Sequence, residues 1–187
     1  MAAVGLYEEV LIAGFGGQGI ISAGKLLAYA SMRVGKEVTC MPSYGAEVRG
    51  GTANCMVVIA DEPIASPLIS FPDSLIAMNA ASVNKFAAKI KDGGLLVFNS
   101  SLVDNKPQLP ESIKSLAIPA DDIATELGDK KIANTVMLGA YLETKAVLTL
   151  QAAIESLSDV LAKRHHKALP LNITALKRGA QFAKDTG

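Results

Sequence analysis

The stretch Val10-Leu11-Ile12-Ala13-Gly14-Phe15-Gly16-Gly17-Gln18-Gly19-Ile20 decides the fold that we expect for this chain. Its first four residues are apolar and typical of a buried strand, and a helical pattern runs from its last residue to about Met32. The glycines between them match G-x-G-x-x-G in the strand-turn-helix context that gives this motif a meaning. The stretch therefore predicts an α/β fold built on a strand, a tight turn and a helix.

The first glycine loop, residues 14–19, predicts a site for an anion. At such a turn the free N–H groups at the start of the helix face a bound anion. We expect a phosphate-bearing ligand or a closely approaching partner, and the candidate residues are Gly14, Gly16, Gly17, Gln18 and Gly19. The alternative is a structural turn that lets the helix pack on the sheet. Gln18 could bind a phosphate or a partner chain, or it could be a solvated residue of the first helical turn.

The pattern after the first glycine loop argues against a nicotinamide cofactor. Rossmann sites for NAD usually carry an acid about 20 residues after the glycines, at the end of the second strand. The second predicted strand covers residues 37–41, and Glu37 opens this strand while no acid closes it. This pattern lowers the expectation of NAD and leaves phosphate binding untouched.

A second glycine loop, residues 43–52, reads Ser-Tyr-Gly-Ala-Glu-Val-Arg-Gly-Gly-Thr. Two adjacent glycines allow a close backbone approach, and Arg49 offers a planar fork of donors for phosphate or carboxylate. Glu47 could pair with Arg49 or contact another chain, and Tyr44 could stack on a ligand or lie half-buried. The candidate residues in this loop are Ser43, Tyr44, Gly45, Glu47, Arg49, Gly50 and Gly51.

The remaining pattern predicts a single Rossmann-like three-layer α/β domain over residues 1–187, with a mixed, mostly parallel sheet. The predicted loop 42–51 is too short for a helical crossover, so the strands on either side of it should be antiparallel. Asn79 should cap the helix that follows it. Strands are expected at about 8–13, 37–41, 52–60, 74–78, 95–98 and 116–118, and helices at about 20–32, 80–90, 121–127, 132–145, 150–164 and 172–184.

Composition excludes several classes of function. The formal net charge is zero, aromatic residues make up only 5% and tryptophan is absent, so the sequence lacks a basic footprint and argues against a surface that stacks on nucleic-acid bases. The apolar runs are far shorter than the roughly 20 residues of a membrane span, and no secretory signal is recognisable, so we expect a cytoplasmic protein. Half of the residues are apolar, which suits a subunit that buries much of its surface.

The cysteines and histidines predict no metal site in this chain. An iron–sulfur cluster needs about four cysteines, and only Cys40 and Cys55 are present. Both are expected to be small buried apolar residues, with a redox role as the less favoured alternative. His165 and His166 are adjacent and point in different directions on a helix, so they indicate a solvated or interface surface.

Three motifs together resemble the gamma subunit of 2-oxoacid:ferredoxin oxidoreductases. They are G-F-G-G-Q-G-I at residues 14–20, S-Y-G-A-E-V-R-G-G-T at 43–52 and N-T-V-M-L-G-A at 134–140, and the resemblance extends over roughly residues 10–142. The second motif is closer to the 2-oxoglutarate and branched-chain types than to the pyruvate type. Asn134 in the third motif could contact a ligand, or it could cap the helix that follows it.

The resemblance implies a subunit of an enzyme that decarboxylates a 2-oxoacid with coenzyme A and passes the electrons to ferredoxin. It implies alpha and beta partner subunits, with or without a delta subunit, and places thiamine diphosphate, magnesium and the iron–sulfur clusters on them. The isolated chain is then expected to be inactive and to contribute no catalytic residue. Its two glycine loops could hold the phosphates of coenzyme A or brace the thiamine-bearing subunit.

Two other functions remain open at this stage. The first is a stand-alone nucleotide-dependent oxidoreductase, for which Tyr141 and Lys145 show the spacing Tyr-x-x-x-Lys. The second is a non-catalytic interaction module in which both glycine loops form an interface. A titration with cofactor tests the first alternative, and dependence on coenzyme A tests the second.

Overall fold

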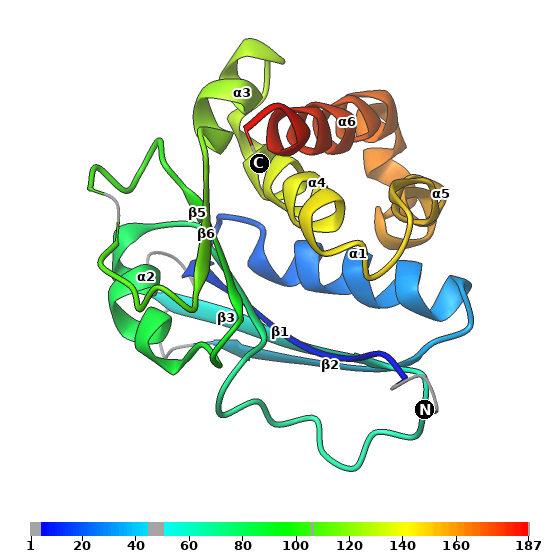
Figure 1. The fold of residues 1–187 in the computed structure, drawn as a ribbon. Helices are drawn as coiled ribbons and strands as arrows, with labels where there is room; N and C mark the ends of the chain where they lie inside the picture. Colours follow the sequence, from blue (N-terminus) through cyan, green and yellow to red (C-terminus); the bar gives the residue numbers. More distant parts are fainter. Residues whose placement is uncertain (1–4, 45–50, 106, 187) are drawn as a thin grey trace.

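The computed structural model describes residues 5–44, 51–105 and 107–186 (Figure 1). The strands are β1 (Tyr7–Phe15), β2 (Glu37–Tyr44), β3 (Thr52–Ala60), β4 (Ser74–Ala77), β5 (Leu95–Asn99) and β6 (Lys114–Ile118). The α-helices are α1 (Ile20–Arg33), α2 (Ala80–Phe86), α3 (Ala120–Glu126), α4 (Ala133–Lys145), α5 (Leu150–Val160) and α6 (Leu169–Thr186). Short 3₁₀ segments are η1 (Ala87–Lys89), η2 (Lys130–Ile132) and η3 (Lys163–Ala168).

The described strands form one six-stranded sheet in the order β2-β3-β1-β4-β5-β6. The pairs β1–β4, β4–β5 and β5–β6 are parallel, whereas β3 is antiparallel to both β1 and β2. The mixed, mostly parallel sheet and the antiparallel pair around the second glycine loop are therefore confirmed. One reversed strand separates this fold from a fully parallel Rossmann sheet.

The second strand is longer than predicted. β2 continues through Pro42 to Tyr44, with Ser43 opposite Asn54 and Tyr44 opposite Ala53. The expectation that the loop starts at Pro42 is therefore wrong. Since β2 is an edge strand, a proline without an N–H group can be accommodated there.

Three helix boundaries also differ from the prediction. The helix expected at 80–90 ends at Phe86 and continues as η1, and the helix expected at 150–164 ends at Val160, ahead of η3. The last helix begins at Leu169, three residues earlier than expected. Asn79 caps α2 as predicted, because its side chain accepts a hydrogen bond from the Ser82 backbone at 2.9 Å.

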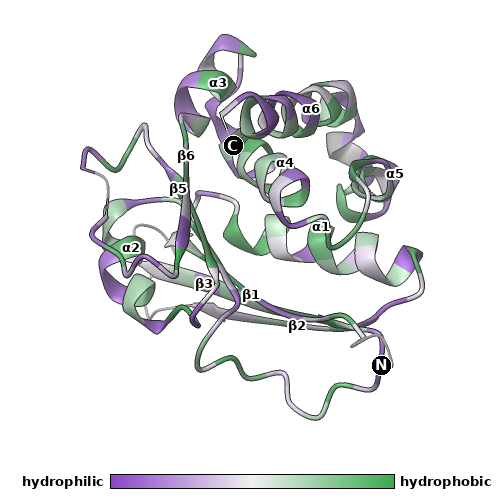
Figure 2. Cartoon of the chain, in the orientation of Figure 1, coloured by the Kyte–Doolittle hydropathy of each residue, from purple (hydrophilic) through white to green (hydrophobic). Residues whose placement is uncertain are grey.

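The sheet separates two apolar layers. Along β1, Val10 and Ile12 belong to the larger cluster beneath α1, α4, α5 and α6, while Leu11 and Ala13 belong to the smaller cluster beneath α2. Figure 1 shows the four larger helices on one side of the sheet and α2 on the other. In Figure 2 the side of α6 that faces away from the sheet is mainly hydrophilic. These observations confirm the three-layer α/β architecture.

Helices α4 and α6 pack with their backbones in contact. A Cβ atom added to Gly139 would overlap the carbonyl of Leu176, and one added to Gly179 would overlap the carbonyl of Val136. Each helix thus has a glycine at the point where the other helix crosses it. This close crossing fixes α4, whose first turn lies beside the first glycine loop.

Candidate functional site

The first glycine loop connects the carboxyl end of β1 to the start of α1. Gly17 has φ of 100° and Gly19 has φ of 73°, a left-handed conformation that side chains rarely adopt. Gly14 is close-packed instead, since an added Cβ would lie 2.8 Å from Oε1 of Gln18 and 3.0 Å from Cβ of Met78. Gly17 and Gly19 are therefore required by the backbone path, whereas Gly14, near the end of β1, is required by close packing, and α1 begins at Ile20.

The two glycine loops meet. The backbone N–H of Gly16 donates to the carbonyl of Gly51 at 2.9 Å, just beyond the last β1–β3 pair, Phe15 and Thr52. The side chains of Ser43 and Tyr44 lie at the end of β2 on the same edge, with Tyr44 61% exposed. Among the other candidates, Gly45, Glu47, Arg49 and Gly50 lie outside the described residues, and their roles stay predictions.

Gln18 stabilises the first glycine loop through hydrogen bonds to other residues of this chain. Its Oε1 accepts hydrogen bonds from the backbone N–H of Phe15 at 2.7 Å and from Nδ2 of Asn79 at 2.8 Å. Its Nε2 donates to the carbonyl of Met78 at 3.4 Å. The interpretation of Gln18 as a solvated residue of the first helical turn is wrong, because it precedes α1 and is half-buried. Its contact with a ligand stays a prediction.

Asn134 anchors the first glycine loop from the opposite side. It is the second residue of α4, is buried, and donates from Nδ2 to the carbonyl of Gly19 at 3.0 Å. The alternative of an N-cap is wrong, since the cap position of α4 is Ile132 and no side chain caps it. The structure thus places Asn134 beside the first glycine loop, through a hydrogen bond that the sequence did not predict. Its contact with a ligand stays a prediction.

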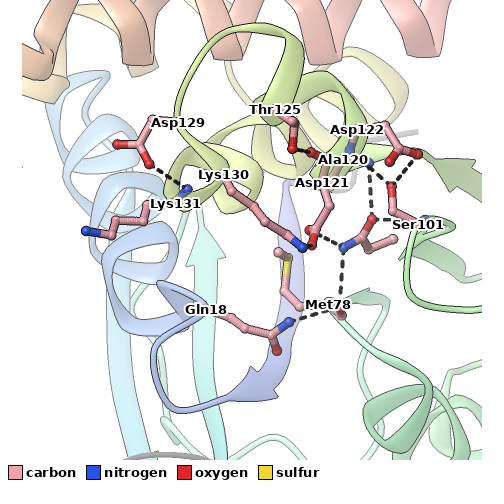
Figure 3. Close-up of polar contacts among 11 residues, drawn as sticks. Gln18, Met78, Ser101, Ala120, Asp121, Asp122, Thr125, Asp129, Lys130 and Lys131 are labelled. Atoms are coloured by element: carbon pink, nitrogen blue, oxygen red, sulfur yellow. Dashed lines mark hydrogen bonds and ion pairs between the residues drawn. The ribbon is translucent and has the colours of Figure 1, made fainter.

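A row of polar groups continues along the carboxyl edge of the sheet (Figure 3). Nδ2 of Asn99 donates to Oδ1 of Asp121 at 2.8 Å and to the Met78 carbonyl at 3.4 Å. Oδ2 of Asp121 pairs with Nζ of Lys130 at 3.1 Å. Through the Met78 carbonyl, which Gln18 also contacts, the row joins the first glycine loop to β4, β5 and the start of α3.

Asn99, Asp121, Lys130 and Lys131 were not among the candidate site residues predicted from the sequence. Asp121 was expected only as an acid that suits the first turn of a helix, a position that the structure confirms. The signal that could have found Asn99 is positional, whereas Lys130 and Lys131 lie in η2, before α4, and show no such signal. Asn99 closes an apolar strand, and the carboxyl ends of parallel strands in an open α/β sheet share one ligand crevice.

A cavity of about 350 Å³ lies against this polar row. A second cavity of about 320 Å³ shares Gly17 and Lys131 with it and runs between α1, α4 and α5, with Asn134 in its wall. Together they suit an elongated ligand with an anionic group near the glycine loop. The first cavity is lined by Gly17, Gln18, Met78, Leu102, Asp121, Lys130, Lys131 and Ala133.

A larger cavity, of about 780 Å³, lies at the opposite edge of the sheet. Leu95 and Lys114, the first residues of β5 and β6, are in its wall together with the segment 109–113. Ligands of open α/β sheets bind beyond the carboxyl ends of the strands. We therefore place the candidate site at the glycine-loop edge, although the cavities there are smaller.

The Tyr141–Lys145 pair is part of a buried network far from the glycine loops. The Tyr141 hydroxyl lies 3.4 Å from Oε1 of Glu8, and Nζ of Lys145 lies 3.1 Å from its Oε2. Glu8 is near the amino end of β1, and Ser74 also donates to it at 2.6 Å. Burial and the Glu8 carboxylate raise the pKa of Tyr141 well above its usual value. This geometry removes the residues on which a hydride-transferring enzyme would depend.

The two cysteines lie close together but in different environments. Cys55 is fully buried, whereas Cys40 is exposed on the edge strand, so the expectation of two buried residues is wrong for Cys40. Their Sγ atoms are 3.5 Å apart. Within residues 5–44, 51–105 and 107–186, no group of three or more His, Cys, Asp and Glu side chains is placed to hold a metal ion.

The family of the chain follows from its sequence over almost its whole length. Residues 9–182 match the sequence model of the family described as pyruvate ferredoxin/flavodoxin oxidoreductase. The chain belongs to this family. The family resemblance that the motifs at residues 14–20, 43–52 and 134–140 indicated is therefore confirmed.

Two relatives represent the branches that the second glycine loop resembles. Ketoisovalerate oxidoreductase subunit VorA of Methanothermobacter marburgensis is 34% identical over 176 residues, which cover 94% of this chain and 36% of the relative. The 2-oxoglutarate synthase subunit KorC of Methanocaldococcus jannaschii is 33% identical over 184 residues, which cover 97% of this chain and 97% of the relative. The chain thus spans about a third of VorA and nearly all of KorC.

A solved structure of the family shows the same fold. The 2-oxoglutarate:ferredoxin oxidoreductase from Magnetococcus marinus, with 2-oxoglutarate, coenzyme A and succinyl-CoA bound, superposes with a TM-score of 0.86 and 31% identity. The alignment covers 96% of this chain and 31% of that chain. In the part of our chain that the structure describes, no helix has both the length and the apolar character needed to cross a membrane.

Proposed function

We propose that this chain is the gamma component of a multi-subunit 2-oxoacid:ferredoxin oxidoreductase. The complex would carry out coenzyme A-dependent oxidative decarboxylation to an acyl-CoA and pass the electrons to ferredoxin. The observation that supports this function best is the junction of the two glycine loops, Gly16 to Gly51, beside a cavity with lysines, in a chain of this family. Alpha and beta subunits, with or without a delta subunit, would complete the enzyme.

The role proposed for this chain is to hold the phosphates of coenzyme A. The donors at the site fit such a group, because Lys130 and Lys131 lie in the wall of a cavity that the first glycine loop closes. The loop opens onto the start of α1, where backbone N–H groups and the helix dipole favour an anion. Lys130 already pairs with Asp121, so Lys131 is the cation that we assign to the phosphate. Arg49, outside the described residues, would add a second.

Coenzyme A, when bound, supplies the thiol that accepts the acyl group. This chain would orient that ligand and exclude water from its phosphate end. Thiamine diphosphate, magnesium and the iron–sulfur clusters would be held by the partner subunits, since a cluster needs about four cysteine ligands and this sequence contains two cysteines. The reaction itself would then take place on atoms that the partners hold.

We propose 2-oxoglutarate as the favoured 2-oxoacid, with a branched-chain 2-oxoacid as the alternative. The relative that this chain covers over nearly its full length is named as a subunit of 2-oxoglutarate synthase, and the longer relative as one of a ketoisovalerate oxidoreductase. Purifying the tagged chain anaerobically with its partners, and assaying viologen reduction on a panel of 2-oxoacids, tests both choices. Activity on neither acid would contradict them.

The proposed role of Lys131 can be tested in the same complex. Lys131→Ala should raise the apparent KM for coenzyme A about tenfold and leave the KM for the 2-oxoacid unchanged, the expected loss of one charged contact to a phosphate. Lys177→Ala, on the exposed face of α6, is the matched control. An unchanged KM for coenzyme A in Lys131→Ala would contradict this assignment.

The interaction module remains a second candidate, because both glycine loops reach the same edge and Tyr44 is largely exposed there. In that case, the Lys131 variant would weaken assembly instead of the response to coenzyme A. The yield of partner subunits that co-purify with the variant distinguishes the two functions.

A further inference from the structure

Two cysteines from neighbouring strands lie side by side on the face of the sheet that α1 covers. Cys40 on β2 is opposite Val57, and Cys55 on β3 is opposite Pro42, so the two residues are diagonal neighbours across the strand pair. Their Sγ atoms are 3.5 Å apart, within hydrogen-bond distance for sulfur. This arrangement places two thiols in contact although 15 residues separate them in sequence.

The two thiols differ in access and in charge. Cys55 is fully buried, and Gly24 of α1 packs so closely on it that an added Cβ would overlap its sulfur. Cys40 is exposed on the edge strand. A hydrogen bond from Cys55 and, to a smaller extent, the ammonium of Lys25 outweigh partial burial and lower the pKa of Cys40 to about 7. Of the two thiols, that of Cys40 is therefore the one that carries negative charge near neutral pH.

We propose that Cys40 and Cys55 form a reversible oxidation site, which hydroperoxides convert into an intrachain disulfide. The geometry supplies the two parts that such a site needs: an accessible thiolate that attacks the peroxide and a second thiol within reach of the oxidised sulfur. The site is independent of the function proposed above. It lies between β2 and β3, and neither cysteine lines the cavity beside the first glycine loop.

The reaction proceeds in two balanced steps. The Cys40 thiolate attacks one oxygen of the hydroperoxide; the O–O bond breaks, an S–O bond forms, and the alkoxide or hydroxide that leaves takes a proton from water. The resulting sulfenic acid of Cys40 is then attacked by the sulfur of Cys55, which forms the S–S bond. The sulfenic hydroxyl leaves with the Cys55 proton as water, so the thiol pair loses two electrons and the peroxide gains them.

The disulfide would change the strand that leads into the second glycine loop. An S–S bond is about 2.0 Å long, so the sulfurs must approach each other by roughly 1.5 Å. β2 can shift because it is an edge strand, paired only with β3 among the described strands. The bond would tie β2 to β3 immediately before Pro42 and Ser43 and fix the path of the chain into that loop.

The test is a titration of the full-length chain, purified anaerobically, with hydrogen peroxide. We expect the mass to fall by two hydrogens and both thiols to become unreactive, with a peptide linking Cys40 to Cys55 that dithiothreitol releases. Cys40→Ser should abolish the reaction. Cys55→Ala should stop it at the sulfenic acid, which dimedone traps on Cys40. Cys55→Ala removes the second thiol without burying a new polar group.

Three results would overturn the proposal. They are two thiols that remain reactive at peroxide concentrations that oxidise free cysteine, oxidation of Cys40 to the sulfinic acid with Cys55 still a thiol, and disulfides only between chains. Circular dichroism of each variant confirms that its fold is intact. If Cys55→Ala does not fold, the wild-type peptide map and the Cys40→Ser variant still decide between these outcomes and the intrachain disulfide.

Discussion

The side-chain amide of Asn134 donates a hydrogen bond to the carbonyl oxygen of Gly19 at 3.0 Å, across 115 residues of sequence. Gly19 immediately precedes α1, and Asn134 lies in the first turn of α4. The contact is so close that a Cβ on Gly19 would lie 2.6 Å from Nδ2 of Asn134. The conformation of the first glycine loop therefore depends on α4 as well as on its own glycines.

Asn134→Ala should lower the free energy of unfolding by about 1–2 kcal/mol, because it removes a hydrogen bond from a carbonyl that is partly buried. Urea denaturation followed by circular dichroism measures this change. Asn84→Ala, on the exposed side of α2, is the control and should change the free energy of unfolding by less than about 0.5 kcal/mol. A variant at 134 as stable as wild type would show that the contact contributes little.

Gly179→Ala should lower the free energy of unfolding by about 1–3 kcal/mol or more, because the added methyl group would overlap the backbone carbonyl of Val136 on α4. The helices cannot separate without opening the buried layer above the sheet. The midpoint of thermal unfolding measures the effect, with Lys177→Ala on the exposed face of the same helix as control. A rise in stability, as expected from the helix propensity of alanine, would contradict the close crossing.

Much of the sheet could be predicted because each strand shows a local signal. Strand β3 was expected at 52–60 and lies there, and the short connection before it predicted its antiparallel pairing with β2. Pro42 misled the prediction of where β2 ends, since whether a strand tolerates proline depends on whether it is at an edge. That position in the sheet is a property of the whole fold and is not visible in the strand itself.

The candidate site could be predicted only in part. Both glycine loops were identified, because runs of glycine between apolar strands are a local signal, and Gly17 and Gly19 do adopt left-handed backbone. The contact between the loops follows from the strand pairing. The contacts of Asn134 and Asp121 arise from elements that are distant in sequence, so no local pattern indicates them. The same reason explains why Tyr141 and Lys145 suggested a catalytic pair. Their spacing is local, but the acid between them, Glu8, comes from the other end of the chain.

Tyr141→Phe should leave the activity of the proposed oxidoreductase complex within about twofold of wild type. The hydroxyl is fully buried beside Glu8, which keeps its contacts with Ser74 and Lys145 in the variant. A loss of stability of up to about 1 kcal/mol is expected from the long 3.4 Å contact. Viologen reduction at saturating substrates is the measurement. A hundredfold fall in kcat with an unchanged melting temperature would restore the hydride-transfer alternative, since removal of a general acid or base has about that effect.

Alkylation of Cys40 by iodoacetamide should become faster as the pH rises and level off above a midpoint of about 7, compared with 9.0 for an unperturbed thiol. The sign follows from the thiolate being the nucleophile: the hydrogen bond from Cys55 and the charge of Lys25 lower the pKa, so the reactive form is present above the midpoint and is lost below it. Cys55→Ala should move the midpoint upward more than Lys25→Gln, because the hydrogen bond is the larger of the two causes. Alkylation rates, measured by mass spectrometry of the Cys40 peptide, give the midpoints of the wild type and of the two variants. Lys177→Gln is the control. A wild-type midpoint near 9 would mean that the two sulfurs are not in contact in solution.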